Sequence, residues 1–320
     1  MGWFSRKMRL LMRYAPGYTR LLLATVLICA LGCALGLFAI ISFSKTRPWL
    51  SSDDRKRTLH SMKQSESIAD LKRFGMTKKE KAIVMDLLKK FHIVTRRLGM
   101  EYFIYSGTLL GSWRHHSMIP WDDDVDVIMN ISCQARLLDV LSRLKPRYHV
   151  FDSYQIRFKF WSDQSKSLSQ YPWKWPYLDI QFYTGNETHI WDVASEFEDV
   201  KYPRSSVFPL HKRPYESWFL PAPRDTLSVL QLNYADTPTI CTTWFYSHKI
   251  EESLEDVVEI PCASLKTTYP FVHRQVVKGK MQETLKLGDK IIHVKNVDEP
   301  LNSVSEPYAL RRISRRGDVG

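Results

Sequence analysis

The sequence contains 320 residues, of which 44% are hydrophobic and 25% are charged, so it excludes a mainly disordered protein and can build one large domain or two small ones. Residues 1–20 contribute +5 and residues 311–320 contribute +3 to the net charge of +12, which leaves an ordinary +4 for the 290 residues between them and gives no indication of nucleic-acid binding. Five cysteines without a Cys-x-x-Cys pair exclude a disulfide-rich scaffold and give no indication of structural zinc.

The first element along the chain is an apolar segment. Residues 21–44 contain no charged residue, and the stretch 21–42 would form a helix about 33 Å long, which is enough to span a bilayer. A cleaved signal peptide is the alternative, but its apolar region is about 7–15 residues long and no small-residue cleavage site follows Ile41. We therefore expect an uncleaved transmembrane signal-anchor over residues 21–42.

The charges around this segment predict its orientation. Residues 1–20 carry five basic residues and no acidic residue, so the positive-inside rule places them in the cytosol as a short tail and the remaining chain in the lumen of the secretory pathway. Two N-glycosylation sequons, at Asn130 and Asn186, agree with a lumenal body. Asn186 lies in a Thr-Gly-Asn turn and is the better acceptor, whereas Asn130 ends a predicted strand.

The lumenal part divides by composition. Residues 43–76 are rich in Ser, Lys and Arg and poor in large apolar groups, which predicts a stem that holds the body off the membrane. We expect the main domain over residues 77–260, a C-terminal extension of it over 261–310 and a disordered basic tail over 311–320.

Three cysteines lie in the lumenal part, and three cannot all pair. In an oxidising compartment we expect a disulfide between Cys241 and Cys262, with Cys133 buried and free. The other two cysteines belong to the predicted membrane span.

Periodicity predicts a mixed α/β fold. Thr77 and Glu80 match a capping box, and the apolar residues that follow recur at helical spacing until Gly99, so a core-facing helix is expected there. A second helix is expected from Ser106 to Pro120. Further elements are strands over 102–105, 125–129, 154–161, 177–183 and 291–297 and a helix over 225–234.

Four aspartates fall within five positions at the start of one predicted strand. In a strand, side chains at i and i+2 share a face, so Asp124 and Asp126 project together, as does Asp122 if the strand extends that far. Such a cluster is repulsive without a cation, and its hard oxygen ligands suit Mg²⁺ or Mn²⁺ bound together with substrate phosphates. The alternative is a solvated acidic turn.

Two neighbouring features favour the metal interpretation. Gly107 and Thr108 lie between a strand and a helix, where backbone amides can approach a phosphate group. Asp179 lies between Leu178 and Ile180 in an apolar strand, where an acid is costly unless it is paired or bound to metal. A phosphate cradle, an Asp-x-Asp pair and a third carboxylate form a coherent set for phosphoryl chemistry.

Basic and aromatic residues near these motifs allow two interpretations each. Arg157 and Lys159 alternate on one strand face and either bind phosphate or face solvent. His115 and His116 either act in the site or bond locally at a helix end. Four aromatic residues before Asp179 are expected to pack in the core rather than stack on a sugar or base. They are Tyr171, Trp173, Trp175 and Tyr177.

The segment GTLLGSWRHHSMIPWDDDVDV, residues 107–127, resembles the nucleotidyltransferase domain of the LicD family, which includes bacterial phosphocholine transferases, fukutin and fukutin-related protein. The resemblance extends from about Thr77 to Tyr234. It implies a nucleotidyltransferase-like mixed sheet flanked by helices, with Gly107 and Thr108 at the donor phosphates and Arg114 as a phosphate clamp. It also implies metal binding by Asp124 and Asp126. The strand context of Asp179 makes it the third carboxylate, which either completes the metal shell or takes the proton of the acceptor hydroxyl.

The implied reaction moves ribitol 5-phosphate or phosphocholine from CDP-ribitol or CDP-choline onto a glycan hydroxyl and releases CMP, with Mg²⁺ or Mn²⁺ as cofactor. The resemblance places this activity in the Golgi or endoplasmic reticulum lumen, with the Golgi favoured and glycosyltransferases as candidate partners. One alternative is a non-catalytic lumenal binding protein or chaperone that retains the fold. Another is an enzyme that attaches the nucleotide itself and releases pyrophosphate.

Overall fold

The computed structural model describes residues 71–153, 156–194, 199–234, 240–243, 246–255 and 257–301. The predicted tail, membrane span and basic C-terminus, and all but residues 71–76 of the stem, lie outside these residues. Within the described part of the chain, no helix combines the length and apolar character needed to cross a membrane. The chain divides into two units at residues 62 and 63, and every element described below belongs to the second unit.

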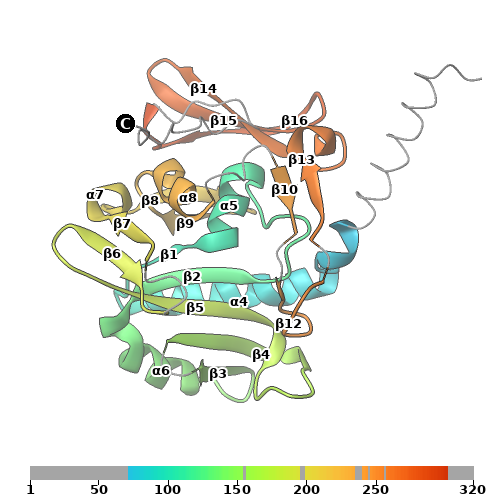
Figure 1. The fold of residues 1–320 in the computed structure, drawn as a ribbon. Helices are drawn as coiled ribbons and strands as arrows, with labels where there is room; N and C mark the ends of the chain where they lie inside the picture. Colours follow the sequence, from blue (N-terminus) through green and yellow to red (C-terminus); the bar gives the residue numbers. More distant parts are fainter. Residues whose placement is uncertain are drawn as a thin grey trace, which may run out of the picture. The chain divides into compact units, whose positions relative to one another are not determined.

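Helix α4 (Lys78–Arg97) begins at the predicted capping box. The Glu80 amide donates to Thr77 Oγ1 over 3.3 Å, and the Thr77 amide donates to Glu80 Oε2 over 2.9 Å. Its apolar stripe packs on the central sheet, running behind strands β2 and β5 in Figure 1. The buried members of this stripe are Ile83, Val84, Leu87, Leu88 and Phe91.

The central sheet is mixed and contains seven strands. Its order is β1-β2-β5-β4-β3, and β6 and β7 extend one end of β5. Strands β2 and β5 are parallel, whereas the other pairs are antiparallel. The strands are β1 (Tyr102–Ile104), β2 (Val125–Asn130), β3 (Tyr148–Ser153), β4 (Arg157–Ser167), β5 (Lys174–Gly185), β6 (His189–Asp192) and β7 (Lys201–Pro203).

The remaining helices connect these strands. Helix α5 (Ser106–His115) joins β1 to β2 and packs against β2 and α8. It ends before the predicted Pro120 because His116 adopts a left-handed conformation, with φ of 51°, and its amide bonds back to the last turn. The others are α6 (Gln134–Ser142), α7 (Arg204–Val207) and α8 (Thr226–Asn233), with 3-10 turns at Ile131–Cys133 and Cys262–Leu265.

One strand boundary predicted in this region is wrong, and strand β3 and helix α6 were not predicted. The strand expected over 154–161 begins at Arg157 and extends to Ser167, and the strand before it, β3, was not predicted. Strand β3 shows no alternation of buried and exposed residues, so its sequence carries no period-2 signal. Helix α6 was also missed, because its buried apolar residues are few.

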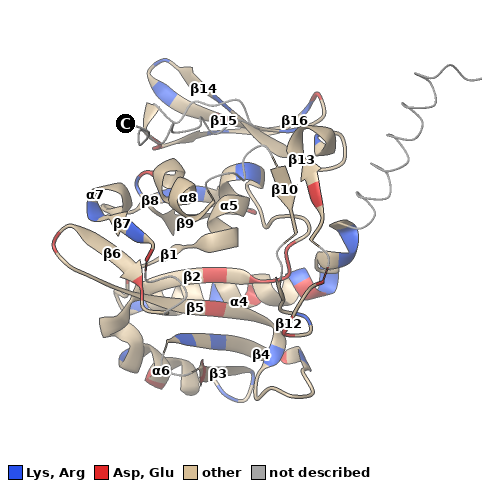
Figure 2. Ribbon diagram, in the orientation of Figure 1, with Lys and Arg blue, Asp and Glu red and all other residues tan. Residues whose placement is uncertain are grey.

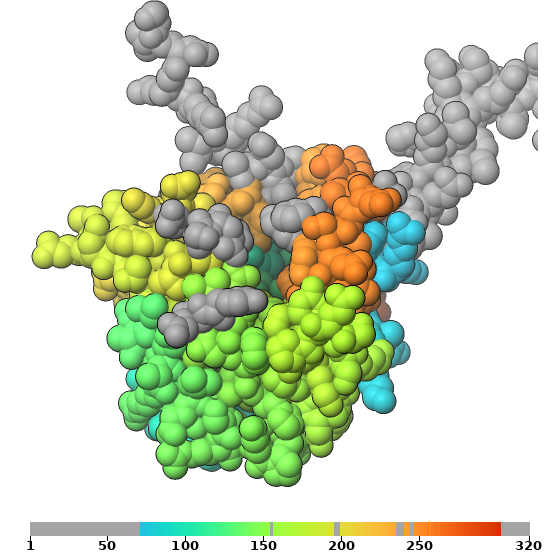
Figure 3. All heavy atoms as spheres, turned by 60° about the horizontal axis from the view of Figure 1, so that its bottom comes forward, coloured from blue at the N-terminus to red at the C-terminus, as the bar shows by residue number. Residues whose placement is uncertain are grey.

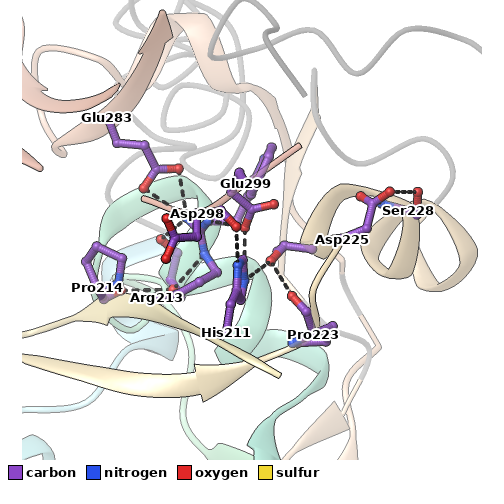
Figure 4. Close-up of polar contacts among 12 residues, drawn as sticks. His211, Arg213, Pro214, Pro223, Asp225, Ser228, Glu283, Asp298 and Glu299 are labelled. Carbon is purple, nitrogen blue, oxygen red and sulfur yellow. Dashed lines mark hydrogen bonds and ion pairs between the residues drawn. The ribbon is translucent and has the colours of Figure 1, made fainter. Parts of the chain in front are cut away.

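A second, antiparallel sheet follows the main domain. It contains β14 (Phe271–Val277), β15 (Lys280–Leu287) and β16 (Lys290–Val297), of which only the last was predicted. It packs on α5 and on the hairpin of β8 (His211–Tyr215) and β9 (Trp218–Ala222). Figure 4 shows Arg213 and His211 reaching from β8 toward Glu283 and Glu299.

Two short hairpin-like pairs complete the described fold. Strand β10 (Ile240–Thr242) pairs with β13 (Glu259–Pro261), and β11 (Tyr246–Ser247) pairs with β12 (Glu252–Ser253). The structure joins Cys241 to Cys262 in a disulfide. Cys133 is free, but it is half-buried rather than buried, because it stands at the beginning of α6.

Candidate active site

Three neighbouring strands bring the predicted carboxylates together. Asp126 on β2 and Asp179 on β5 are Cα partners in the parallel pair, and Lys159 on β4 is the partner of Asp179 on its other side. Figure 2 shows acidic positions on β2 and β5 beside basic positions on β4. All three side chains are buried from bulk solvent and line a cavity of about 570 Å³. The register alone therefore builds a charged site at the centre of the sheet.

Asp126 and Asp179 each have one oxygen fixed by a neighbour. Lys159 Nζ donates to Asp179 Oδ2 over 3.2 Å, and Gln181 Nε2 donates to Asp126 Oδ1 over 3.0 Å. Asp179 Oδ1 is buried and has no hydrogen-bond partner within the described chain. A buried carboxylate oxygen without a partner is costly, so this atom indicates a missing cation or proton donor.

The first turn of α5 borders the same cavity. No side chain caps this helix, and Ser106 adopts a left-handed conformation with φ of 46° at the turn from β1. A Cβ at Gly107 would lie 2.8 Å from Asp122 Oδ2, so any side chain there would displace that carboxylate. An uncapped helix N-terminus with open backbone amides favours an anionic ligand.

Thr108 does not line the cavity as predicted. Its Oγ1 accepts a hydrogen bond of 2.8 Å from the Asp126 amide, which fixes α5 against the start of β2. His115 also lies away from the cavity. It is buried, its Nδ1 is 2.7 Å from the Pro270 carbonyl oxygen, and its Nε2 accepts from Arg114 Nε. The side chains of both residues bond to the protein instead of lining the cavity.

Arg114 lines the cavity near the disulfide. Its guanidinium lies 5.5 Å from the centre of the Trp121 ring, and its Nη1 is 3.8 Å from Cys262 Sγ. Burial lowers the pKa of Arg114 to about 10, against the opposing charge of Asp122, so the group stays positively charged at neutral pH. Arg157 on β4 lines the cavity as well.

The aspartates of residues 122–126 are not equivalent. The Asp123 carboxylate accepts from Ser247 Oγ, His248 Nδ1 and the Lys249 amide, at 2.8, 3.1 and 3.2 Å. These bonds and the charge of His248 overcome the effect of burial and hold the pKa of Asp123 below its usual value. Asp123 therefore anchors the turn between β11 and β12.

The other three aspartates lack such compensation. Burial is the main cause that raises the pKa of Asp122, Asp124 and Asp126 above the usual aspartate value, and the charges of neighbouring aspartates add to it. A divalent cation would remove this repulsion, and carboxylate oxygens are the ligands that Mg²⁺ and Mn²⁺ prefer. The residues present thus fit a bound cation.

His248 belongs to the site but was missed in the sequence. Its Nε2 lies 3.5 Å from Asp124 Oδ2, and ligand atoms of Asp123, Asp124 and His248 all lie within 4.8 Å of one another. Of the predicted metal ligands, only Asp124 belongs to this group. Burial opposes the charged imidazole, but Asp124 and Asp123 raise the pKa of His248 to about 10.

Glu251 lies in the same turn as His248, between β11 and β12, and also lines the cavity. Its carboxylate accepts from Trp173 Nε1, Tyr177 Oη and Tyr246 Oη, at 3.0, 2.5 and 2.9 Å. Lys159 Nζ lies 3.9 Å from the Tyr177 ring centre and 4.0 Å from Glu251 Oε1. In Figure 3 the orange segment that includes this turn lies against the yellow-green atoms of the β4–β5 region. Trp175 and Tyr177 are buried as the core interpretation expects, whereas Tyr171 and Trp173 line the cavity.

The two sequon asparagines differ in their exposure to solvent. Asn186 is exposed in the turn between β5 and β6, where its Oδ1 accepts from the amides of Thr188 and His189. Asn130 is half-buried at the end of β2, and its Oδ1 accepts from the Ser132 amide. Glycosylation of either asparagine stays a prediction.

Comparison with known proteins places this site in a family. Residues 99–225 match the family described as LicD/FKTN/FKRP, nucleotidyltransferase domain. The lipopolysaccharide cholinephosphotransferase LicD of Haemophilus influenzae is 27% identical over 132 residues, which are 41% of this chain and 41% of that protein. The human ribitol 5-phosphate transferase FKRP is 28% identical over 147 residues, 44% of this chain and 29% of that protein.

The chain thus spans less than half the length of these relatives. Among solved structures, the lincomycin-bound lincosamide adenylyltransferase LnuA covers 50% of this chain and 98% of its own, at 12% identity and a TM-score of 0.30, which is too low to support a conclusion. The family match contains the aspartate cluster, the first turn of α5 and strands β2, β4 and β5. Residues 99–225 therefore form a nucleotidyltransferase domain that belongs to the LicD family.

Proposed function

We propose that this chain is a metal-dependent phosphotransferase that moves a phosphorylated alcohol from a CDP-linked donor to a glycan hydroxyl and releases CMP. The observation that carries this proposal is the pairing of Asp126 with Asp179 on parallel strands, beside the uncapped first turn of α5. The names of the relatives support either choline phosphate or ribitol 5-phosphate as the transferred group.

The first turn of α5 is suited to bind the donor phosphates. Gly107 lines the cavity, and the helix N-terminus attracts negative charge. Arg114 and Arg157 line the same cavity and would supply charged donors to the phosphate oxygens. These groups orient the donor before transfer.

Asp124 and Asp126 would hold the divalent cation. When bound, the cation neutralises the donor phosphates and the charge that develops on the leaving CMP. The raised pKa values of the two carboxylates support this role, because burial, and after it the charges of neighbouring aspartates, penalise the charged forms that a cation would stabilise.

Asp179 is suited to accept the proton of the attacking hydroxyl. Lys159 fixes its Oδ2, its Oδ1 has no hydrogen-bond partner among the described residues, and the residue lines the cavity. A bond forms between the acceptor oxygen and the phosphorus that carries the alcohol. The bond from that phosphorus to the CMP oxygen breaks, and the acceptor proton passes to Asp179.

We also propose that the chain is a single-pass type II protein of the Golgi membrane. The apolar stretch 21–42 and the basic residues before it support this topology. The exposed sequon at Asn186 and the Cys241–Cys262 disulfide support an oxidising lumen. Its partners would then be the glycosyltransferases that build the acceptor glycan.

The experiment that tests the reaction is CMP release by the full chain, purified in detergent, with Mn²⁺, a pool of cell-surface glycans and either CDP-ribitol or CDP-choline. We expect CMP with one donor and its loss in Asp126→Asn and Asp179→Asn. Asp163→Asn, an exposed aspartate on β4, is the matched control and should keep full activity.

Two outcomes would contradict the proposal. Pyrophosphate in place of CMP, from a nucleotide donor, would indicate transfer of the nucleotide itself. No release with either donor, from protein shown to be folded, together with unchanged cellular glycans in Asp126→Asn, would favour the non-catalytic binding protein.

A further inference from the structure

We propose that His248 is a nitrogen ligand of the cation at Asp124, and that Asp123 holds its imidazole in the ligating orientation. The proposal deepens the proposed function and rests on it only for the presence of a divalent cation at Asp124. His248 lies 125 residues after Asp123 in the sequence and reaches the site through the turn between β11 and β12.

The spacing of the two ligand atoms suits one ion. His248 Nε2 and Asp124 Oδ2 are 3.5 Å apart. Two ligands of an octahedral ion with bonds of about 2.1 Å lie about 3.0 Å apart when adjacent and about 4.2 Å apart when opposite. The observed separation lies between these values, so both atoms can bind the same cation after a small adjustment.

Asp123 occupies the position behind the imidazole. Its Oδ1 is 3.1 Å from His248 Nδ1, while its Oδ2 accepts from Ser247 Oγ and the Lys249 amide. Both oxygens thus already accept hydrogen bonds, which suits Asp123 to hold the imidazole rather than to bind the cation. A carboxylate bonded to one imidazole nitrogen keeps a proton there. Because Asp124 and Asp123 hold the imidazole in its charged form, the cation would displace the second proton, on Nε2, to solvent and take its place beside Asp124.

A separate observation indicates that this cavity takes a ligand. Asp179, which is only 3% exposed, leaves Oδ1 without a hydrogen-bond partner in the described residues and lines the same cavity as His248. If residues 122–126 were only a solvated acidic turn, the buried Asp179 oxygen and the oriented His248 beside it would have no explanation.

A nitrogen ligand changes which cation the site prefers. Mg²⁺ binds oxygen ligands almost exclusively, whereas imidazole adds affinity for first-row transition ions. We therefore expect the site to prefer Mn²⁺ over Mg²⁺, and His248→Gln to reduce that preference by weakening Mn²⁺ more than Mg²⁺.

The test is pulsed electron paramagnetic resonance of the full chain with Mn²⁺ and no donor. Bound Mn²⁺ should show a ¹⁴N coupling, which [¹⁵N]histidine labelling of the natural sequence converts to a ¹⁵N coupling. His248→Gln should lose the coupling, and Asp123→Asn should weaken Mn²⁺ binding about 10–100-fold. His189→Gln, a histidine on β6, should change neither.

Three results would overturn the proposal: no Mn²⁺ binding, bound Mn²⁺ without nitrogen coupling, or coupling that persists in His248→Gln. If the variants do not fold, the labelled natural chain still shows whether a histidine nitrogen binds the ion, and among the described residues His248 is the one histidine that lines this cavity. Because the measurement needs no donor, an intact nitrogen coupling without CMP release would contradict the proposed function and leave this ligand assignment in place.

Discussion

Helix α5 carries a cluster of buried charge at each end, and the two clusters differ in whether the protein balances them. At its start lie Asp122, Asp124 and Asp126, whose pKa values burial and mutual repulsion raise. Beyond its end lies a second cluster, the C-terminal charge network. It consists of His116, Arg213, Arg274, Glu283 and Glu299.

The C-terminal charge network is neutralised by its own members. Glu283 is fully buried, yet Arg213 and Arg274 lie 2.9 and 2.8 Å from its Oε1, and His116 Nε2 lies 2.7 Å from its Oε2. Burial would raise the pKa of Glu283, but the two arginines hold it far below the usual glutamate range. Buried charge therefore does not by itself indicate a ligand site, whereas unbalanced buried charge does.

The largest effect is expected from Asp126→Asn. The variant should reduce CMP release about 1,000-fold, because it removes a charge that acts at the reacting phosphates. Its free energy of unfolding should not fall, because one source of repulsion is removed. Rates of CMP release and urea unfolding measure the two effects, and a large loss of stability would mean that the acidic cluster is structural.

The reverse pattern is expected for Glu283→Gln. Removing this carboxylate leaves the buried Arg274 without a carboxylate partner and Arg213 with Glu299 alone, and should lower the free energy of unfolding by about 3–5 kcal/mol. Glu252→Gln, an exposed glutamate on β12, should change it by less than about 0.5 kcal/mol. Urea unfolding followed by circular dichroism measures both free energies of unfolding. Equal effects of the two variants would contradict the conclusion that the C-terminal charge network stabilises the fold.

Added Mn²⁺ should stabilise the natural chain by about 2.7 kcal/mol at a free concentration 100 times its dissociation constant. Asp124→Asn should lose this stabilisation, because it removes an oxygen ligand, whereas Asp163→Asn should keep it. Thermal unfolding with and without a chelator measures the shift. A shift of the same size in Asp124→Asn would place the cation elsewhere.

The smallest expected effect is an opposite pH dependence of the two clusters. Asp124 and Asp126 have a higher pKa in the folded chain than in the unfolded chain. Their protonation therefore stabilises the folded chain fully below the unfolded pKa, and this stabilisation is lost as the pH rises through the folded pKa. Glu283, with a lowered pKa, contributes stability above its unfolded pKa of about 4.5, and this is lost as pH falls. Stability of the metal-free chain should therefore rise from pH 7 toward pH 5 and fall below about pH 4.5, as measured by thermal unfolding with a chelator.

The sequence predicted the parts of the site that are local. Gly107 and the aspartates lie within 20 residues, and the helix and strand that carry them have clear periodicity, so their juxtaposition followed from the chain itself. Asp179 was also selected from the sequence, as an acid in an apolar strand, but the parallel pairing that sets it beside Asp126 is seen only in the structure.

The sequence could not predict contacts that only the fold creates. His248 and Glu251 lie on a turn between strands of two residues each, which leave no periodic signal. Glu283 lies among polar residues on β15, a pattern typical of a solvent-exposed position. The groups that neutralise its charge come from β8, β14 and the end of α5, which are distant in the sequence. Such residues become recognisable only when the register is known.

The most direct test of the central claim is CMP release from the preferred donor before chelation, after chelation, and after Mn²⁺ is restored. We predict that release falls to background when the cation is removed and returns with Mn²⁺ in the natural chain, but never in Asp126→Asn. Undiminished release from protein shown to be free of metal would contradict the claim that the unbalanced carboxylates at the start of α5 form a cation-dependent phosphotransfer site.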